Sequence, residues 1–306
     1  MKILIISSNL IGDTILSTGV INYFMKKNQL AKFTFIIGPT AGQIYQNFPN
    51  LDKIISIKKQ KFNLHWLEIY RNCYKTKWDI IVDLRSSFLS FFLSHKKKFI
   101  FKKDKNLHHL DQFKKFFKIN NSELIIHNNK FEQDKTESKL DKNKKYIVIF
   151  PGGNWKPKIW PSEYYNKLIK LLDKNYKNIC FIFVGSSSEE KKYLDKISID
   201  LPKEKFINLM GETLTQTSSY MKKSDLFIGN DSGLMHLSFA SNLKTVCLFG
   251  PTNDKVYGHT NENCFIIRTK EDYSYFKKIY LNKEKSYMES IKPESILQLI
   301  KSKNLL

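Results

Sequence analysis

The chain has 306 residues, of which 42% are hydrophobic and 14% are aromatic. This is enough apolar material for two ordinary domain cores, so the composition excludes a globally disordered protein. No stretch approaches the roughly 20 uninterrupted apolar residues of a membrane-spanning helix, and the short apolar run at residues 3–6 is unlike a signal peptide. We therefore expect a cytoplasmic protein.

Lysine dominates the formal net charge of +22, because only three of the 51 basic residues are arginine. One interpretation is codon bias in an A+T-rich genome, which spreads lysine over solvated surfaces. The other is attraction of an anionic partner, such as nucleic acid, phosphorylated lipid or acidic sugar. The scarcity of arginine argues against base-specific DNA recognition, which depends on bidentate arginine contacts.

Apolar runs of strand length alternate with segments of helical period along most of the chain. The runs lie at residues 2–7, 33–38, 54–57, 79–84, 146–150, 179–185, 206–209, 225–229, 244–249 and 264–267. Their continuous apolar character is typical of parallel strands that are buried on both faces. Helices are predicted at 14–27, at 162–174, from Leu214, which follows a capping-box pair at Thr213 and Gln216, and within 291–306. The pattern predicts a doubly wound α/β fold.

A change in composition divides the chain. Residues 127–145 hold few apolar side chains and many charges of both signs, which is typical of a linker or exposed loop. We therefore expect a first domain at 1–130, a linker at 131–145 and a second domain at 146–306. The last helix is a candidate to cross back over the first domain.

Ligands of open α/β sheets bind beyond the carboxyl ends of the strands, and two loops of the second half suit an anion. Gly152, Gly153 and Asn154 follow the strand at 146–150. The glycines would let backbone N–H groups approach a phosphate and Lys158 would add a charge, although the loop also reads as a packed Pro/Gly turn.

The loop after the strand at 225–229 carries Asp231, Ser232 and Gly233. Either Asp231 or Ser232 can cap the next helix, whose free N–H groups would then face a diphosphate. His236 is predicted equally well as a ligand contact or as a satisfied helix residue.

Two further loops complete the set. Glu189, after the strand at 179–185, is a candidate ribose contact, while the serines before it are ordinary helix caps. Thr252 lies in a Gly/Pro turn after the strand at 244–249. Four such loops at the same end of their strands predict one nucleotide site. Zinc spacing, a Walker loop and a D-x-D motif are all missing from the sequence, so no metal site and no required cofactor are predicted.

In the first half, Asp13 follows the strand at 2–7 and begins the helix at 14–27. The loop is not a G-x-G-x-x-G fingerprint. Asp13 is therefore either a helix cap or a carboxylate that acts as a general base.

Together these residues resemble the bacterial ADP-heptose:lipopolysaccharide heptosyltransferases, glycosyltransferase family 9. The resemblance runs from about residue 1 to 260. It rests on four segments: Gly12-Asp13, Pro151-Gly152-Gly153-Asn154-Trp155 continued by Lys158-Ile159-Trp160-Pro161, Asn230-Asp231-Ser232-Gly233-Leu234-Met235-His236, and Phe249-Gly250-Pro251-Thr252.

The resemblance implies a GT-B fold, with two Rossmann-like doubly wound domains facing a central cleft. It also implies inverting transfer of a sugar from a nucleotide-diphosphosugar donor, ADP-heptose. Asp13 matches the general base, Lys158 a donor-phosphate lysine, Glu189 a ribose contact, and Asp231, Ser232 and Gly233 the loop near the diphosphate. His236 matches the motif histidine.

The acceptor is not carried over by the resemblance, because residues 85–118 fit no motif of the family. Basic residues gather there among phenylalanines: Arg85, Lys96, Lys97, Lys98, Lys102, Lys103, Lys105, Lys114 and Lys115. We expect Arg85 and Lys96–Lys98 to contact a phosphorylated lipid-linked glycan, with the protein peripheral at the inner face of the cytoplasmic membrane. A lysine-biased solvated surface explains the cluster equally well.

Two alternatives to the transferase remain at this level. A nucleotide-sugar epimerase with the same two-domain plan would convert its sugar without any acceptor. A nucleic-acid-binding protein is suggested only by the net charge, and we expect no nucleic-acid partner.

Overall fold

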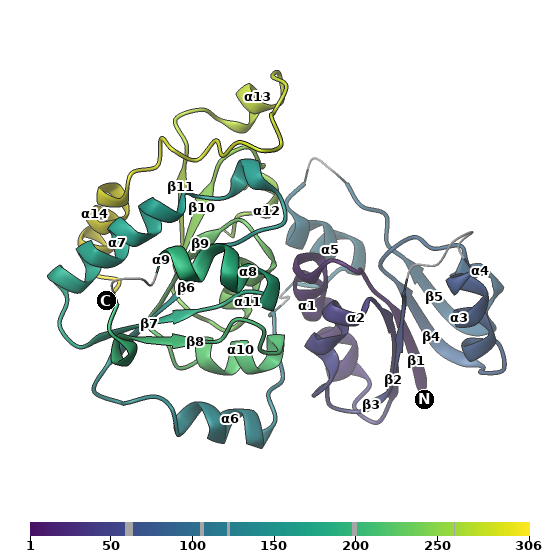
Figure 1. The fold of residues 1–306 in the computed structure, drawn as a ribbon. Coiled ribbons are helices and arrows are strands. Elements are labelled where there is room, and N and C mark those ends of the chain that lie inside the picture. The colour runs from purple at the N-terminus through teal and green to yellow at the C-terminus, as the bar shows by residue number, and fades with distance from the viewer. Residues whose placement is uncertain (59–63, 105–106, 121–122, 198–200, 260) are drawn as a thin grey trace. The chain divides into compact units, whose positions relative to one another are not determined.

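The computed structural model describes residues 1–58, 64–104, 107–120, 123–197, 201–259 and 261–306. The chain forms two compact units, Met1–Asn129 and Lys130–Leu306, and each unit contains its own parallel sheet (Figure 1). Both units are α/β, as the alternating pattern predicted.

The first unit is built on five parallel strands in the order β3-β2-β1-β4-β5. They are β1 (Lys2–Ile6), β2 (Lys32–Ile37), β3 (Leu51–Ser56), β4 (Trp78–Asp83) and β5 (His95–Ile100). The central strand β1 is fully apolar beyond its first residue, because helices cover both faces of the sheet. Four of these strands were expected from the sequence, and the edge strand β5 was not.

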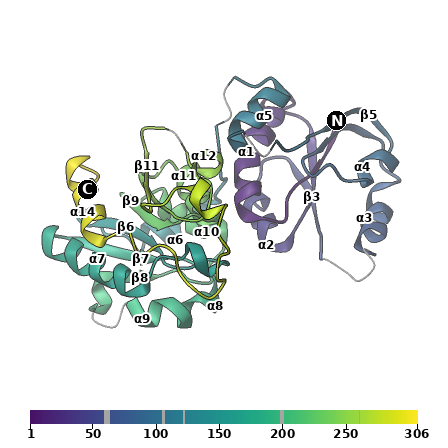
Figure 2. The same cartoon turned by 90° about the horizontal axis from the view of Figure 1, so that it is seen from above.

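Helices cover the two faces of this sheet in separate groups. In Figures 1 and 2, α1 (Ile11–Lys27), α2 (Pro39–Gly42) and α5 (His109–Phe117) lie on one side, and α3 (His65–Cys73) and α4 (Leu89–Phe92) lie on the other. The face under α3 and α4 packs Ile69, Cys73, Leu89 and Leu93 against sheet residues such as Ile81. Strands β1 and β4 are neighbours, so the loops that follow them lie together at the carboxyl end of the sheet, where open α/β sheets bind ligands.

The second unit has six parallel strands in the order β11-β10-β9-β6-β7-β8, and all six were expected. They are β6 (Lys145–Phe150), β7 (Ile179–Phe183), β8 (Phe206–Asn208), β9 (Leu226–Asn230), β10 (Thr245–Phe249) and β11 (Cys264–Arg268). Strands β7, β6, β9 and β10 are consecutive neighbours, so the loops that follow them meet at one edge of the sheet.

The helices of the second unit also divide between two faces. The helices α7 (Ser162–Asn175), α9 (Asp195–Ile197) and α14 (Pro293–Ser302) share one hydrophobic core with the sheet. Helices α10 (Leu214–Met221) and α11 (Gly233–Ala240) contribute no side chain to that core and contact each other, as expected for the opposite face when crossovers are right-handed. Short helices α8 (Ser187–Glu189), α12 (Asp254–Tyr257) and α13 (Tyr273–Phe276) lie in the connections.

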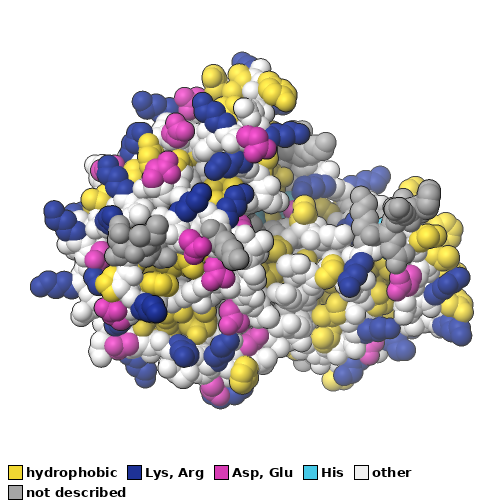
Figure 3. Space-filling model, viewed as in Figure 1, with side chains coloured by type: hydrophobic (Ala, Val, Ile, Leu, Met, Phe, Trp, Pro, Cys, Tyr) yellow, Lys and Arg dark blue, Asp and Glu magenta, His cyan; other side chains and the backbone are white. Residues whose placement is uncertain are grey.

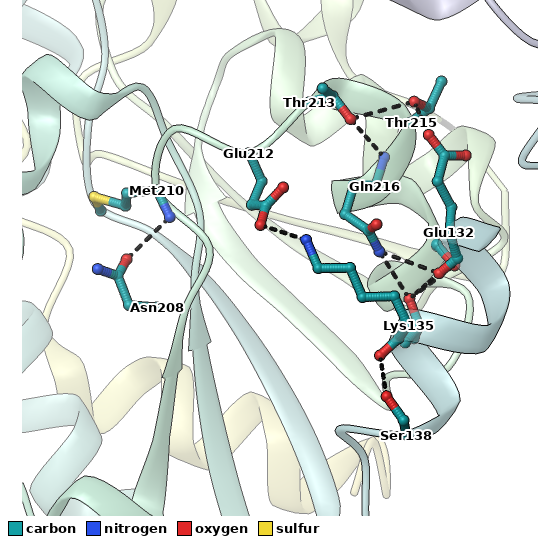
Figure 4. Close-up of polar contacts among 11 residues, drawn as sticks. Glu132, Lys135, Ser138, Asn208, Met210, Glu212, Thr213, Thr215 and Gln216 are labelled. Atoms are coloured by element: carbon teal, nitrogen blue, oxygen red, sulfur yellow. Dashed lines mark hydrogen bonds and ion pairs between the residues drawn. The ribbon is translucent and has the colours of Figure 1, made fainter.

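The prediction of a linker at 131–145 is wrong for the first half of that segment. Residues Lys130–Glu137 form helix α6, which packs against α10 through buried polar side chains (Figure 4). Glu132 accepts a hydrogen bond from the Thr215 hydroxyl, and the Gln216 amide donates to the Glu132 carbonyl. A helix held by polar contacts lacks the apolar stripe by which helices are recognised in a sequence, which explains the error.

The C-terminal helix does not follow the expectation that it crosses back over the first domain. Helix α14 packs on α7 within the second unit, where Ile296 and Ile300 are fully buried in the core.

The face of the molecule drawn in Figure 3 carries side chains of both charges. Lys and Arg side chains are spread over the face drawn in Figure 3, where Asp and Glu are interspersed among them. Across the described ranges, the structure contains no helix with the length and apolar character that crossing a bilayer requires.

Candidate active site

A cavity of about 230 Å³ opens in the first unit at the carboxyl ends of β1 and β4. Its lining is polar and charged over a large part: Ser7, Ser8, Asp13, Ser17, Leu84, Arg85, Ser86, Phe101, Lys103, His109 and Phe113. The loops after β1 and β4, helices α1 and α5, and the segment after β5 all contribute. This is the place at which open α/β sheets bind ligands.

Asp13 lies in the first turn of α1 and points into this cavity. The cap position of the helix is Leu10 and no side chain caps it, so the alternative that Asp13 serves only as a helix cap is wrong. Asp13 Oδ1 lies 3.6 Å from His109 Nε2 and 3.7 Å from Lys103 Nζ, whereas Oδ2 accepts a hydrogen bond from the Ser8 hydroxyl at 3.5 Å. One quarter of the Asp13 side chain remains exposed, which leaves the carboxylate accessible to a ligand.

His109 is the residue of this site that the sequence did not indicate. It begins α5, is 3% exposed, and packs edge-to-face on Phe113. Burial lowers the pKa of His109 to about 4, although the neighbouring Asp13 carboxylate raises it in part. The ring is therefore neutral at pH 7, and its Nδ1 has no hydrogen-bond partner among the residues that the structure describes.

The basic residues expected to bind an acceptor separate into two groups. Arg85 lines the cavity together with Lys103. Lys96 instead pairs with Asp79, 2.6 Å away at the amino ends of the strands, and Lys97 and Lys98 lie along β5. The assignment of Lys96–Lys98 to an acceptor remains a prediction, and the cavity does not include them. Lys105 lies outside the described residues.

The loops of the second unit meet as the order of the strands requires. Gly153 N–H, after β6, donates to Glu189 Oε1 at 2.7 Å, after β7. Asn230, at the end of β9, donates to the Gly152 carbonyl at 2.8 Å and accepts from Trp160 N–H at 3.0 Å. The N–H of Asp231 reaches the carbonyl of Leu248 in β10. Four loops that are far apart in the sequence thus form one polar edge.

Lys158 and Asp231 join two of these loops through an ion pair, with 3.6 Å between Nζ and Oδ2. Both side chains are largely buried, at 16% and 8% exposed. Asp231 immediately precedes the cap residue of α11, so the ion pair holds Lys158 near the start of that helix, where anions are favoured.

Glu189 has a structural role that the sequence did not predict, because only the serines before it were interpreted as helix caps. Its Oε2 accepts hydrogen bonds from the N–H and the hydroxyl of Ser186, which completes a capping box. Its Oε1 holds Gly153, whose φ of +155° suits glycine, and a Cβ on Gly152 would collide with the same oxygen. Glu189 therefore braces the two glycines, and its contact with a ribose stays a prediction.

The remaining predicted residues lie along the same edge. Ser232 is the cap of α11 and accepts from Met235 N–H, and Gly233 begins the helix. His236 is buried, with its Nδ1 2.9 Å from His259 Nε2. Asn154 is exposed in its loop, and the buried Thr252 hydroxyl has no hydrogen-bond partner in the described structure.

Arg268 is a second residue that sequence reasoning missed. It lies at the end of β11 and its guanidinium binds the carbonyls of Gly250 and Thr252 and the carboxylate of Asp254. Arg268 thereby fixes the loop that carries Thr252. An isolated arginine in a strand gives no signal of this role in a single sequence.

Within the described ranges, no three His, Cys, Asp or Glu side chains gather in a way that could hold a metal ion.

Comparison with known proteins identifies the family. The profile of glycosyltransferase family 9 (heptosyltransferase) matches residues 105–287. A lipooligosaccharide heptosyltransferase 2 of Campylobacter jejuni is 26% identical, over 100% of this chain and 98% of that protein.

Two solved structures show the same fold. A family 9 glycosyltransferase of Veillonella parvula has a TM-score of 0.80 at 21% identity, over 99% of this chain and 97% of that one. An Escherichia coli heptosyltransferase, WaaC, solved with ADP-2-deoxy-2-fluoro heptose, has a TM-score of 0.73 at 15% identity, over 99% of both chains. The fold is therefore GT-B, with two Rossmann-like domains. The chain belongs to glycosyltransferase family 9, the heptosyltransferases, and is an enzyme of the glycosyl-transfer class.

Proposed function

We propose that the protein transfers heptose from ADP-heptose to a lipopolysaccharide-type acceptor, with inversion at the anomeric carbon. The observation that carries the proposal is the position of Asp13. Its carboxylate does not cap the helix and instead lines a ligand-sized cavity at the carboxyl ends of two strands. Family membership supports glycosyl transfer over the epimerase and the nucleic-acid-binding alternatives. The sugar nucleotide in the Escherichia coli relative and the name of the Campylobacter jejuni relative support the donor and acceptor classes.

In the proposed reaction the acceptor hydroxyl oxygen attacks the anomeric carbon of the donor, while the bond from that carbon to the diphosphate breaks. Asp13 receives the hydroxyl proton. Lys103 and His109 both approach Oδ1, whereas the contact given for Oδ2 is the long hydrogen bond from the Ser8 hydroxyl, so we assign the proton to Oδ2. A positioned general base contributes about 10²–10⁴-fold to the rate.

The departing ADP accumulates negative charge, which the second unit is built to stabilise. Lys158 supplies a partly buried positive charge, and the N–H groups of Ser232 and Gly233 lie at the start of α11. Preorganised donors of this kind stabilise a leaving group without reorganisation during the reaction. We assign Gly152, Gly153 and Thr252 to the same donor site, because their loops are tied to it by Glu189 and Arg268.

We assign the acceptor to the first unit and infer that it is a phosphorylated, lipid-linked glycan. Arg85 and Lys103 supply two cations in the cavity of Asp13, which suits anionic groups close to the reacting hydroxyl. A lipid-linked acceptor places the enzyme at the inner face of the cytoplasmic membrane.

The direct test is the dependence of ADP release on both substrates. The protein is incubated with ADP-heptose in the presence and absence of a heptose-free lipopolysaccharide precursor, and sugar products are analysed. The proposal predicts ADP release and a heptosylated lipid only when the precursor is present. An isomerised sugar nucleotide without any precursor would support the epimerase instead. GDP- and UDP-sugars serve as donor controls.

A further inference from the structure

Helix α4 leaves three adjacent phenylalanines exposed. Phe88, Phe91 and Phe92 are 84%, 60% and 70% exposed, while Leu89 and Leu93 of the same segment are buried in the core. The two leucines are sufficient to anchor the segment. Folding therefore does not explain the phenylalanines, and a contiguous exposed apolar patch of this kind marks an interaction surface.

Lysines adjoin this apolar patch. Lys98 Nζ lies 4.1 Å from the centroid of the Phe91 ring, which places the two side chains on the same face of the sheet. Side chains alternate along a strand, so the exposed Lys96 of the edge strand β5 shares this face with Lys98. Lys97 points to the opposite face, where its Nζ lies 5.0 Å from the centroid of the Phe99 ring. We call Phe88, Phe91, Phe92, Lys96 and Lys98 together the α4–β5 surface.

The chain runs directly from the cavity of Asp13 to the α4–β5 surface. Arg85 and Ser86 line that cavity, and Phe88 lies two positions after Ser86. The buried Asp83 carboxylate holds the connection by accepting hydrogen bonds from Arg85 N–H and from both the N–H and the hydroxyl of Ser87. A partner bound by the phenylalanines thus lies next to the proposed acceptor site.

We propose that the α4–β5 surface docks on an anionic lipid bilayer, with the phenylalanines inserted at the headgroup boundary and the lysines on the lipid phosphates. Aromatic side chains beside lysines are the composition of interfacial membrane anchors. Each lysine close to an anionic membrane strengthens binding about fivefold. A second copy of this chain is a poorer occupant, because a two-fold contact would bring the lysines of the two copies together.

This inference rests on the proposed function, because docking on a membrane would bring the enzyme to a lipid-linked acceptor. The binding itself is measured without any reaction, so its failure is distinct from a failure of the proposed catalysis. The assay is sedimentation of the purified full chain with vesicles of phosphatidylethanolamine and phosphatidylglycerol, compared with phosphatidylcholine alone.

Two variants and two matched controls test the surface. We expect F88S/F91S/F92S and K96S/K98S each to reduce binding to the anionic vesicles at least tenfold. The controls are F131S, which removes an exposed phenylalanine from α6, and K277S/K278S, which removes two exposed lysines; both should bind as the wild type does. Unchanged melting temperatures confirm that all four proteins are folded.

A second readout connects docking to turnover. F88S/F91S/F92S should keep its rate on an acceptor dissolved in detergent and lose most of its rate on an acceptor embedded in anionic vesicles. Three results would overturn the proposal: no vesicle binding by the wild type, equal losses in variants and controls, or a wild-type dimer that the phenylalanine variant abolishes.

Discussion

His109 Nε2 lies 3.6 Å from Asp13 Oδ1 inside the cavity of the first unit, and the two residues come from helices that are almost 100 positions apart in the sequence. The contact is an imidazole that burial keeps neutral beside a carboxylate that is partly open to ligands. With Lys103 on the same oxygen, His109 distinguishes the two oxygens of the proposed base.

The depressed pKa of His109 predicts a loss of stability in mild acid. The unfolded chain binds a proton at His109 near pH 6.5, whereas the folded protein binds it only near pH 4, so unfolding becomes easier as the pH falls through this window. The full effect is about 3 kcal/mol in the free energy of unfolding. His109→Phe, which keeps a ring against Phe113, should remove this component.

The measurement is urea unfolding of the wild type and His109→Phe at about pH 7.5 and about pH 5. The wild type should lose about 2 kcal/mol more than the variant between these conditions. Parallel losses in the two proteins would show that His109 titrates alike in the folded and unfolded states.

Lys158 should contribute directly to ADP binding. Charge-assisted hydrogen bonds contribute about 1.5–3 kcal/mol, so Lys158→Ala should weaken the affinity for ADP by about 10- to 100-fold. Calorimetric titration measures the change, and Lys174→Ala, an exposed position on α7, is the matched control. An unchanged dissociation constant in Lys158→Ala would remove this lysine from the donor site.

Glu189 offers a test that separates its two interpretations. As a brace of Gly153 and Ser186 it shapes the phosphate loop, so Glu189→Ala should weaken the binding of both ADP and inorganic pyrophosphate. As a ribose contact alone it would affect only ADP. Competition titrations with the two ligands decide between them, and equal pyrophosphate affinity in variant and wild type would contradict the brace.

Much of the fold could be predicted from the sequence, because buried parallel strands carry an unbroken apolar signal. Strand β5 was missed since three consecutive lysines, Lys96–Lys98, occupy an edge strand, and such charges are how edge strands avoid pairing with other chains. Helix α6 was missed because polar side chains, including the buried Glu132, hold it.

The start of helix α10 shows which features depend on local sequence and which depend on tertiary contacts. Thr213 caps α10 as its spacing predicted, by accepting from Gln216 N–H. The Gln216 side chain does not complete the box, because it turns to Glu132 and Thr136 of α6 instead (Figure 4). Local spacing therefore predicted the start of the helix, while the partner of Gln216 depended on a helix that the sequence concealed.

Some residues of the candidate site could be predicted from the sequence, and others could not. The meeting of four loops at one edge of the second sheet could be predicted, because each loop follows an apolar strand and the strands are parallel. His109, Lys103 and Arg268 could not be assigned, since their proximity to Asp13 or to the Thr252 loop depends on tertiary packing. Resemblance to a family transfers motif residues and leaves such neighbours out.

The most direct test of the account is the turnover of Asp13→Asn with ADP-heptose and a heptose-free lipopolysaccharide precursor. Asparagine keeps the size of the side chain but cannot accept the proton, so the rate should fall about 10²–10⁴-fold while the affinity for ADP stays as in the wild type. Asp111→Asn, an exposed carboxylate on α5, should leave the rate unchanged. Wild-type turnover by Asp13→Asn would contradict the assignment of Asp13 as the base.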